Sequence, residues 1–167
     1  MRILLIGGAL GAVVLALAAC GGSSTSSASE QAVQRQADLY AIDRIEKDFH
    51  EATSRHDIDL MMSLWAPNAT FTVGPGQTAA GKKEIRRFWL EKSVAFEPSN
   101  HWVSDTAAYK IRITVNGDRG TLYFECHYID LKTGKIVVVT GADQEVARIN
   151  GRWLITSMVG GSATLSP

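Results

Sequence analysis

The sequence lacks the features that mark nucleic-acid binding, phosphate binding and disulfide-stabilised folds. Its 17 basic residues are balanced by 17 acidic residues, so no basic patch for nucleic acid is indicated. Two cysteines are too few for a framework of several disulfides. Gly74-Pro75-Gly76 has neither the lysine nor the following helix of a phosphate-binding loop, and no nucleophile elbow is present. Nucleic acid is therefore not an expected partner.

Metal ligands are also sparse. A metal site needs three or four convergent ligands. His50 and His56 lie near the end of a predicted helix, at a spacing that is poor for sharing one ion. His101, Glu125 and His127 would meet only if three strands aligned them. The sequence therefore predicts no metal, and nothing in it indicates a cofactor.

The N-terminus carries an unbroken run of apolar and small residues from Ile3 to Ala19, which is typical of a secretory signal. The run ends in Leu-Ala-Ala followed by Cys20 and Gly21, and this resembles the signal of bacterial lipoproteins. A transmembrane anchor is one alternative, but the run is short for a span and no basic residue follows it until Arg35. An ordinary secretory signal that is cleaved elsewhere is the other.

The lipoprotein resemblance implies that residues 1–19 are removed and that Cys20 receives the lipid, with palmitate among its acyl chains. The expected location is the cell envelope, outside the cytoplasm, with the membrane bound through Cys20. Residues 20–33 then form a lipidated cysteine and a flexible Gly/Ser-rich tether. Cys126 is left without a disulfide partner and is interpreted as a small buried hydrophobic residue.

Three helices are predicted before the C-terminal third of the chain. The first, from about Glu30 to Ser54, has one apolar face. A short second helix follows an N-cap at Asp57 and is expected to stop before Pro67. The third covers about residues 81–92. A short strand is predicted over residues 69–73, before the Gly-Pro-Gly turn.

Residues 101–160 are predicted to form four consecutive β-strands. Two of the three reversals carry Asn-Gly, at Asn116-Gly117 and at Asn150-Gly151, and the third is the Lys-Thr-Gly-Lys sequence of residues 132–135. Alternation separates Phe124 and Cys126 from Glu125 and His127, but the pattern leaves open which of these two faces is concave.

Helices followed by an antiparallel sheet predict the α+β class. The expected architecture is a strongly curved, mostly antiparallel β-sheet with about three helices packed on its concave face, which leaves a conical pocket. One domain over residues 34–161 is expected, followed by a short tail of residues 162–167.

This domain resembles the SnoaL-like group of the nuclear transport factor 2-like superfamily. The resemblance rests on the Leu-Trp-Ala-Pro-Asn-Ala-Thr-Phe sequence of residues 64–71 and on the Arg-Ile-Asn-Gly-Arg-Trp-Leu-Ile sequence of residues 148–155. It implies a cone-shaped fold that serves enzymes such as isomerases and dehydratases, ligand binders and interaction domains.

The catalytic residues that the resemblance implies are only partly present. His101 matches the histidine of the dehydratase-like members, but Phe49 and Ser54 stand where those members have tyrosine and aspartate. Phenylalanine has no hydroxyl to polarise a carbonyl, and serine is no general base unaided. Residues 71–76 also lack the aspartate that ketosteroid-isomerase-like members place before their turn.

His101 and Asp105 are the candidate catalytic residues, because strand parity puts them on one face with the apolar Ile111. Glu125 is a possible assisting carboxylate, or a solvated residue of the outer face. The expected ligand-binding residues are aromatic side chains of the pocket wall and one histidine: Tyr40, Phe49, Trp65, Phe88, Trp102 and His127.

Three functions stay open from the sequence. The first is a lipid-anchored domain that binds a small apolar or amphipathic ligand without an intact known catalytic set. The second is an isomerase, dehydratase or hydrolase that uses His101 as general base. The third is an interaction domain that forms a homodimer through the outer face of its sheet, which carries Tyr123 and Ile129 near the Val137–Val139 run.

Overall fold

A computed structural model describes residues 23–74 and 76–164 of the chain. The predicted signal segment, Cys20 and the last residues of the predicted tail lie outside the described residues. Within them, no helix is both long and apolar enough to cross a membrane. The described residues form an α+β fold, as predicted, with three α-helices and a seven-stranded sheet.

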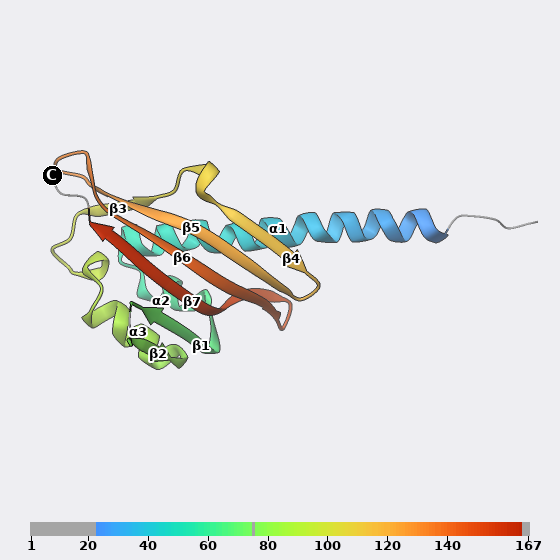
Figure 1. The fold of residues 1–167 in the computed structure, drawn as a ribbon, viewed down its shortest axis with the longest axis horizontal. Coiled ribbons are helices and arrows are strands. Elements are labelled where there is room, and N and C mark those ends of the chain that lie inside the picture. The colour runs from blue at the N-terminus through green and yellow to red at the C-terminus, as the bar shows by residue number, and fades with distance from the viewer. Residues whose placement is uncertain (1–22, 75, 165–167) are drawn as a thin grey trace, which may run out of the picture.

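The helices and the strands follow the order expected from the sequence (Figure 1). The helices are α1 (Ser23–Arg55), α2 (Ile58–Ser63) and α3 (Gly81–Glu91), with 3₁₀ turns η1 (Val94–Phe96) and η2 (Ala108–Lys110). The strands are β1 (Trp65–Val73), β2 (Thr78–Ala80), β3 (Trp102–Asp105), β4 (Arg112–Asn116), β5 (Arg119–Asp130), β6 (Lys135–Ile149) and β7 (Arg152–Thr164).

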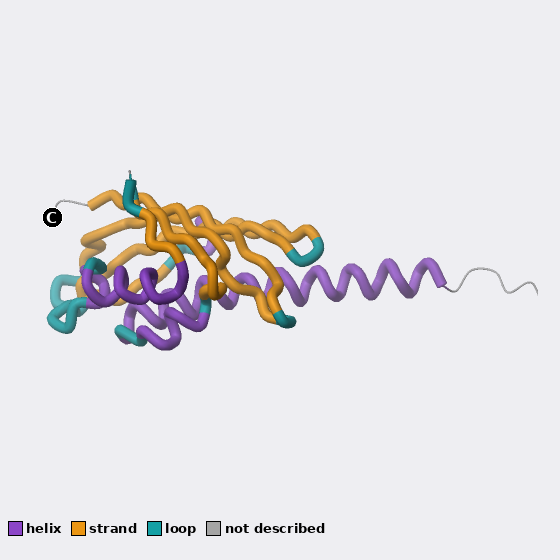
Figure 2. The backbone as a smooth tube through the Cα atoms, turned by 90° about the horizontal axis from the view of Figure 1, so that it is seen from below, coloured by secondary structure: helices purple, strands orange, loops and turns teal. Residues whose placement is uncertain are grey.

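The sheet is curved and mostly antiparallel. Its strand order is β2-β1-β7-β6-β5-β3, and β4 also pairs with β5. Only the β1–β7 pair is parallel among the described strands. Figure 2 shows the helices on one side of the sheet, so that the sheet has one covered face and one outer face. This arrangement confirms the predicted fold class.

Helix α1 begins at Ser23 rather than at Glu30, within the segment that the sequence predicts to be a flexible tether. The N-terminal half of α1 extends beyond the sheet (Figure 1), and its residues 27–37 are exposed. Ile42, Ile45, Phe49 and Ala52 are buried, as their spacing predicts. The sequence pattern therefore predicted α1 from about Glu30 onwards, but not its first residues, 23–29.

Strands β6 and β7 are attached to α1 through Asp38. Arg148 of β6 places Nη2 2.6 Å from Asp38 Oδ2, and the indole Nε1 of Trp153 donates to Asp38 Oδ1 at 3.3 Å. Asp38 is 5% exposed, so its carboxylate needs these partners. The arginine and tryptophan that carried the family resemblance therefore attach α1 to the sheet.

Helix α2 is capped as predicted, because Asp57 Oδ1 accepts hydrogen bonds from the backbone N–H groups of Asp59 and Leu60. The expected role of Pro67 as the helix stop is wrong. The helix ends at Ser63, and Pro67 lies inside β1, where the pairing of β1 with β7 is interrupted between Trp65 and Thr70.

The predicted first strand of the meander is two strands. Residues 108–110 form η2, which separates β3 from β4, and both strands pair with β5. The two Asn-Gly sequences also differ. Asn150 and Gly151 both have positive φ, as a type I′ turn requires, whereas Asn116 pairs with Arg119 and leaves Gly117 and Asp118 at the centre of the turn.

A candidate ligand-binding cavity

A cavity of about 510 Å³ lies between the covered face of the sheet and the helices. Phe49 of α1, Phe88 and Trp89 of α3, and Phe71 of β1 form an aromatic wall. The opposite wall comes from the sheet, through Cys126, Tyr128, Thr140, Ala142 and Met158. Residues 93–95 and Trp102 complete the lining.

The aromatic wall is held by ring contacts between side chains far apart in the sequence. Phe71 stacks on Trp89 with ring centroids 5.6 Å apart and planes 11° apart. Phe49 meets Trp89 edge-on at 5.4 Å, and Phe88 meets Phe71 edge-on at 4.9 Å. Offset stacking and edge-to-face contacts are the preferred geometries of such pairs, so this wall is a well-packed apolar surface.

The lining carries no charge. No aspartate, glutamate, lysine, arginine or histidine is among the described residues that line the cavity. Its polar side-chain groups include a thiol, a phenol and hydroxyls, from Cys126, Tyr128, Thr140 and Ser93. The wall residue Trp89 also carries an indole N–H that has no hydrogen-bond partner among the described residues. An ionic ligand would lose its hydration here without gaining a counter-charge, so the cavity suits an uncharged molecule.

Cys126 and Tyr128 stay protonated at neutral pH. Burial raises the pKa of the Cys126 thiol to about 12, although hydrogen bonds with Thr140, Ser104 and Tyr128 oppose the rise. Burial also raises the pKa of the Tyr128 hydroxyl well above its usual value, and the neighbouring Cys126 adds to this. The thiol is therefore a neutral wall group rather than a nucleophile.

A buried polar network lies between α1 and β3, next to the cavity. His50 of α1 places Nε2 3.1 Å from Glu46 Oε1 and Nδ1 2.5 Å from Ser104 Oγ of β3. His50 Nε2 also contacts Thr106 Oγ1, which donates to the carbonyl of Glu125. Ser104 hydrogen-bonds in turn with Cys126. The network therefore connects a buried carboxylate to a residue of the cavity wall.

The sequence did not single out this network. The sequence indicates His50 only as a poor metal ligand, and it predicts no role in a site for Glu46 or Ser104. The spacing of Glu46 and His50 by one helical turn was a usable signal, because residues four apart share a face. That this face is buried, with Glu46 4% and His50 7% exposed, follows only from the packing of α1 on β3.

The predicted ligand-binding residues fall into two groups. Phe49, Phe88 and Trp102 line the cavity. Trp65 is fully buried but is not part of the lining, Tyr40 is 66% exposed, and His127 lies on the outer face of the sheet. Contact of any of the six with a ligand stays a prediction.

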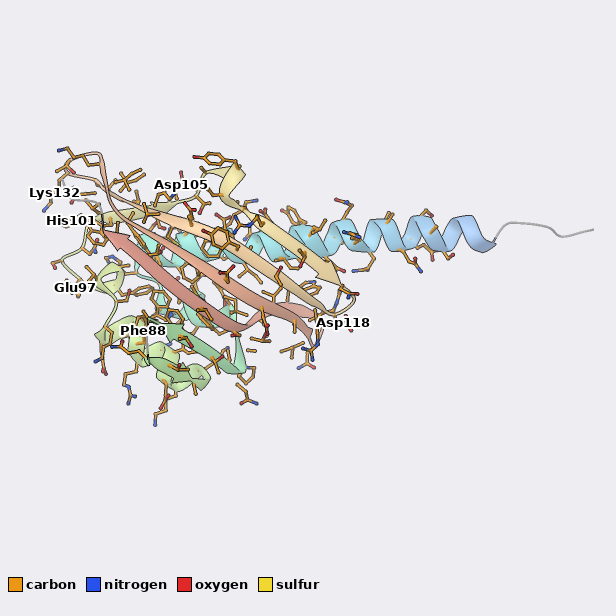
Figure 3. The ribbon with its side chains drawn as sticks, viewed as in Figure 1. Phe88, Glu97, His101, Asp105, Asp118 and Lys132 are labelled. Carbon is orange, nitrogen blue, oxygen red and sulfur yellow. The ribbon has the colours of Figure 1, made fainter. Side chains whose placement is uncertain are left out.

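His101 and Asp105, the predicted catalytic pair, are both exposed and are not part of the cavity lining. Figure 3 shows His101 at the end of the sheet near Lys132, and the backbone carbonyl of His101 accepts from the N–H of Leu131 at 3.2 Å. Trp102 and Ser104 are the inward residues of β3 instead. The parity argument assumed one regular strand as far as Ile111, and η2 interrupts it.

Glu125 and His127 lie on the outer face, which settles the question that alternation left open. Phe124 and Cys126 are buried on the covered face. Glu125 Oε1 lies 3.0 Å from Lys110 Nζ, and Glu125 Oε2 lies 3.1 Å from His127 Nε2. Hydrogen bonds from Lys110 and then His127 lower the pKa of Glu125 to about 2. Across the described residues, no group of three or more potential ligands could hold a metal ion.

The family model of the SnoaL-like domain matches residues 47–154. The chain belongs to this family. The matched segment includes Phe49, Trp89, Cys126 and Thr140, so the SnoaL-like domain contains the greater part of the cavity wall. No curated protein matches the chain significantly.

Solved structures of the same fold are similar in shape and distant in sequence. An NTF2-like protein with a cystatin-like fold from Novosphingobium aromaticivorans has a TM-score of 0.67 at 12% identity, over 85% of this chain and 90% of that chain. The hexachlorocyclohexane dehydrochlorinase LinA-type3 from Novosphingobium barchaimii has a TM-score of 0.66 at 16% identity, over 81% and 92%. At these identities the likeness shows the NTF2-like fold of the SnoaL-like domain.

Proposed function

We propose that this SnoaL-like domain is anchored outside the cytoplasm by a lipid on Cys20 and binds a small, uncharged, apolar or amphipathic ligand in its cavity. The observation that carries the proposal is the uncharged, largely aromatic lining of the 510 Å³ cavity. Pockets of this size with few polar groups are typical of small-molecule sites.

The energetics of such a site favour an apolar body. A ligand that buries about 250 Å² of apolar surface gains roughly 6 kcal/mol, before the loss of its translational and rotational freedom. The similarity to a dehydrochlorinase named for hexachlorocyclohexane supports the view that this fold accommodates compact, uncharged molecules. The thiol, phenol and hydroxyl groups of Cys126, Tyr128 and Thr140 also suit a ligand that carries a few polar groups.

The lipid anchor is supported by the sequence that ends at Cys20 and by the shape of the described domain. The N-terminal half of α1 extends away from the sheet (Figure 1), so the attachment point need not touch the cavity. A membrane attachment would also place the site close to a reservoir of apolar molecules. The chain would then collect its ligand at the membrane surface.

Native mass spectrometry tests the ligand. The full chain, produced in a bacterium with its own leader and released in mild detergent, is expected to carry a bound molecule that organic solvent extracts. The variant Ala142→Leu, which fills the cavity from β6, is expected to carry none. A wild-type chain without any bound molecule, which also fails to bind added uncharged aromatics, would overturn the proposal.

Metabolic labelling with palmitate tests the anchor. The wild-type chain is expected to incorporate the label and to sediment with membranes, and Cys20→Ala is expected to do neither. Equal labelling of both chains would contradict lipidation at Cys20. Because the ligand experiment does not depend on this result, the two parts of the proposal can fail separately.

A further inference from the structure

Gln144 of β6 is the one residue of the described core whose side-chain amide has neither atom paired. Its Oε1 and Nε2 have no hydrogen-bond partner among the described residues, and the residue is 2% exposed. A buried amide without partners is costly, and such groups in folded proteins usually have an explanation. Gln144 therefore needs either an enclosed partner or a function.

Its position in the strand is next to the cavity lining. Thr140 and Ala142, on the same strand and at alternate positions, line the cavity, and Gln144 is the next residue in that alternation. Its direct neighbour across the sheet is Met158 of β7, which also belongs to the lining. Gln144 therefore adjoins lining residues both along its own strand and across the sheet.

Met158 has a side chain that can adopt several rotamers. Its side chain is unbranched and flexible, and methionine commonly fills irregular space near binding surfaces. A rotamer change at Met158 would open the cavity toward Gln144 without a change of backbone. The amide would then form a polar end to an otherwise apolar site.

We propose that Gln144 is the specificity-determining residue of this site and binds a neutral hydroxyl group of the ligand. The inference rests on the proposed function. A hydroxyl donates one hydrogen bond and accepts others, so it pairs with both Oε1 and Nε2 of the amide. A carboxylate or an ammonium group does not fit, because the cavity lining supplies no charge to balance it. The ligand class is therefore an alcohol with a compact apolar body.

The test uses two ligands and two chains. The ligands are 4-phenylbutan-1-ol and pentylbenzene, which have the same number of non-hydrogen atoms and differ only in a terminal hydroxyl against a methyl group. The chains are the wild type and Gln144→Met, in which the side chain keeps its length and loses the amide. Tryptophan fluorescence reports binding, since Trp89 and Trp102 line the cavity.

The expected result is a selective loss. Gln144→Met weakens binding of the alcohol roughly fivefold, the effect of one neutral hydrogen bond, and leaves pentylbenzene within about twofold. Without ligand, the variant melts at a temperature about 2–6 °C higher, because the unpaired amide is gone. Gln144→Leu should give the same pattern, and this control excludes an effect that is specific to the methionine side chain.

Two results overturn the inference. If Gln144→Met changes the affinity for both ligands equally, or for neither, Gln144 does not bind the hydroxyl, while the proposed function stands. This is also the result expected if an enclosed water satisfies the amide, in which case the variant melts at a lower temperature. If neither ligand binds the wild-type chain, the inference and the proposed ligand site fail together.

Discussion

The two faces of strand β5 differ in the charge of the side chains that they present. On the outer face, Glu125 is surrounded by Lys110, His127 and Tyr123 within hydrogen-bond distance. On the inner face, Phe124, Cys126 and Tyr128 carry no charge. The same strand therefore presents a compensated ion cluster to solvent and a neutral wall to the cavity.

The two faces therefore differ in whether they present an ionised side chain. General acid–base catalysis needs an ionisable group within reach of the substrate. Here the described carboxylates and histidine of β5 and β3 lie outside the cavity lining, and the thiol and phenol of β5 that line it are held protonated. Among the described residues, the cavity wall therefore presents neutral groups, and the ionised groups of β5 pair with one another on the outer face.

The Glu46–His50 pair is the exception on the inner side. Its ring lies edge-on against Phe124, with centroids 5.4 Å apart, and its two nitrogens are occupied by Glu46, Ser104 and Thr106. Because every polar atom of the imidazole has a partner, the network is satisfied without access to the cavity. The network stabilises the packing of α1 on β3 beside the cavity.

Phe124→Ala is expected to have the largest effect on stability. Phe124 is 1% exposed and packs against Phe49 with ring centroids 5.3 Å apart, so truncation leaves a hole behind the cavity. The free energy of unfolding should fall by about 4 kcal/mol. Urea denaturation measures it, with Tyr123→Ala on the outer face as control. Equal losses for the two variants would mean that the faces do not differ as described.

His50→Phe should come next, with a loss of about 3 kcal/mol in the free energy of unfolding. The substitution keeps an aromatic ring but leaves the Glu46 carboxylate buried without its partner. The matched control is His127→Phe, at a histidine that pairs with a carboxylate on the outer face. The double variant with Glu46→Gln should recover part of the loss. Similar small losses for His50→Phe and His127→Phe would contradict the buried network.

Glu125→Gln should change how stability depends on pH. The folded pKa of Glu125 is about 2 and the usual value is about 4.5, so its carboxylate favours the folded state. That contribution is fully present above about pH 5 and is lost as the pH falls toward 2. Urea denaturation from pH 6 to pH 2.5 should show the wild type approaching the variant. A constant difference across this range would mean that Glu125 is not held ionised by its neighbours.

Alkylation of Cys126 should show the smallest effect, a change of rate without a change of fold. With a thiol pKa of about 12, the thiolate fraction at pH 8 is roughly a thousand times smaller than for a free thiol, so the reaction with iodoacetamide should be at least about a hundred times slower. Cys20→Ala leaves Cys126 as the single thiol. Its rate should rise with pH and fall when pentylbenzene is present. A fast reaction at pH 8 would show a thiolate in the cavity wall.

The sequence predicted the fold better than the site for identifiable reasons. Spacing along α1 placed Phe49 correctly on the buried face, whereas alternation along β5 separated Phe124 from Glu125 without showing which of the two faces is buried. Register and strand breaks are not local properties. One 3₁₀ turn at residues 108–110 separated His101 and Asp105 from the regular strand on which their prediction depended.

Residues whose role depends on contacts with residues far away in the sequence were the hardest to predict. Glu46, His50 and Ser104 are ordinary in their local sequence and become a network only when α1 lies across β3. Gln144 alternates with neighbours of the inner face, but nothing in the sequence shows that its amide is left unpaired. Tertiary packing decides both cases, and local patterns do not encode it.

The most direct test of the account is whether the space inside the cavity, rather than a surface, binds the ligand. Ala142 points into the cavity, and the next residue, Asp143, points out from the same strand. Titration of pentylbenzene by tryptophan fluorescence should give saturable binding for the wild type and for Asp143→Leu, and at least tenfold weaker binding for Ala142→Leu. Equal affinities for all three chains would contradict binding in the cavity.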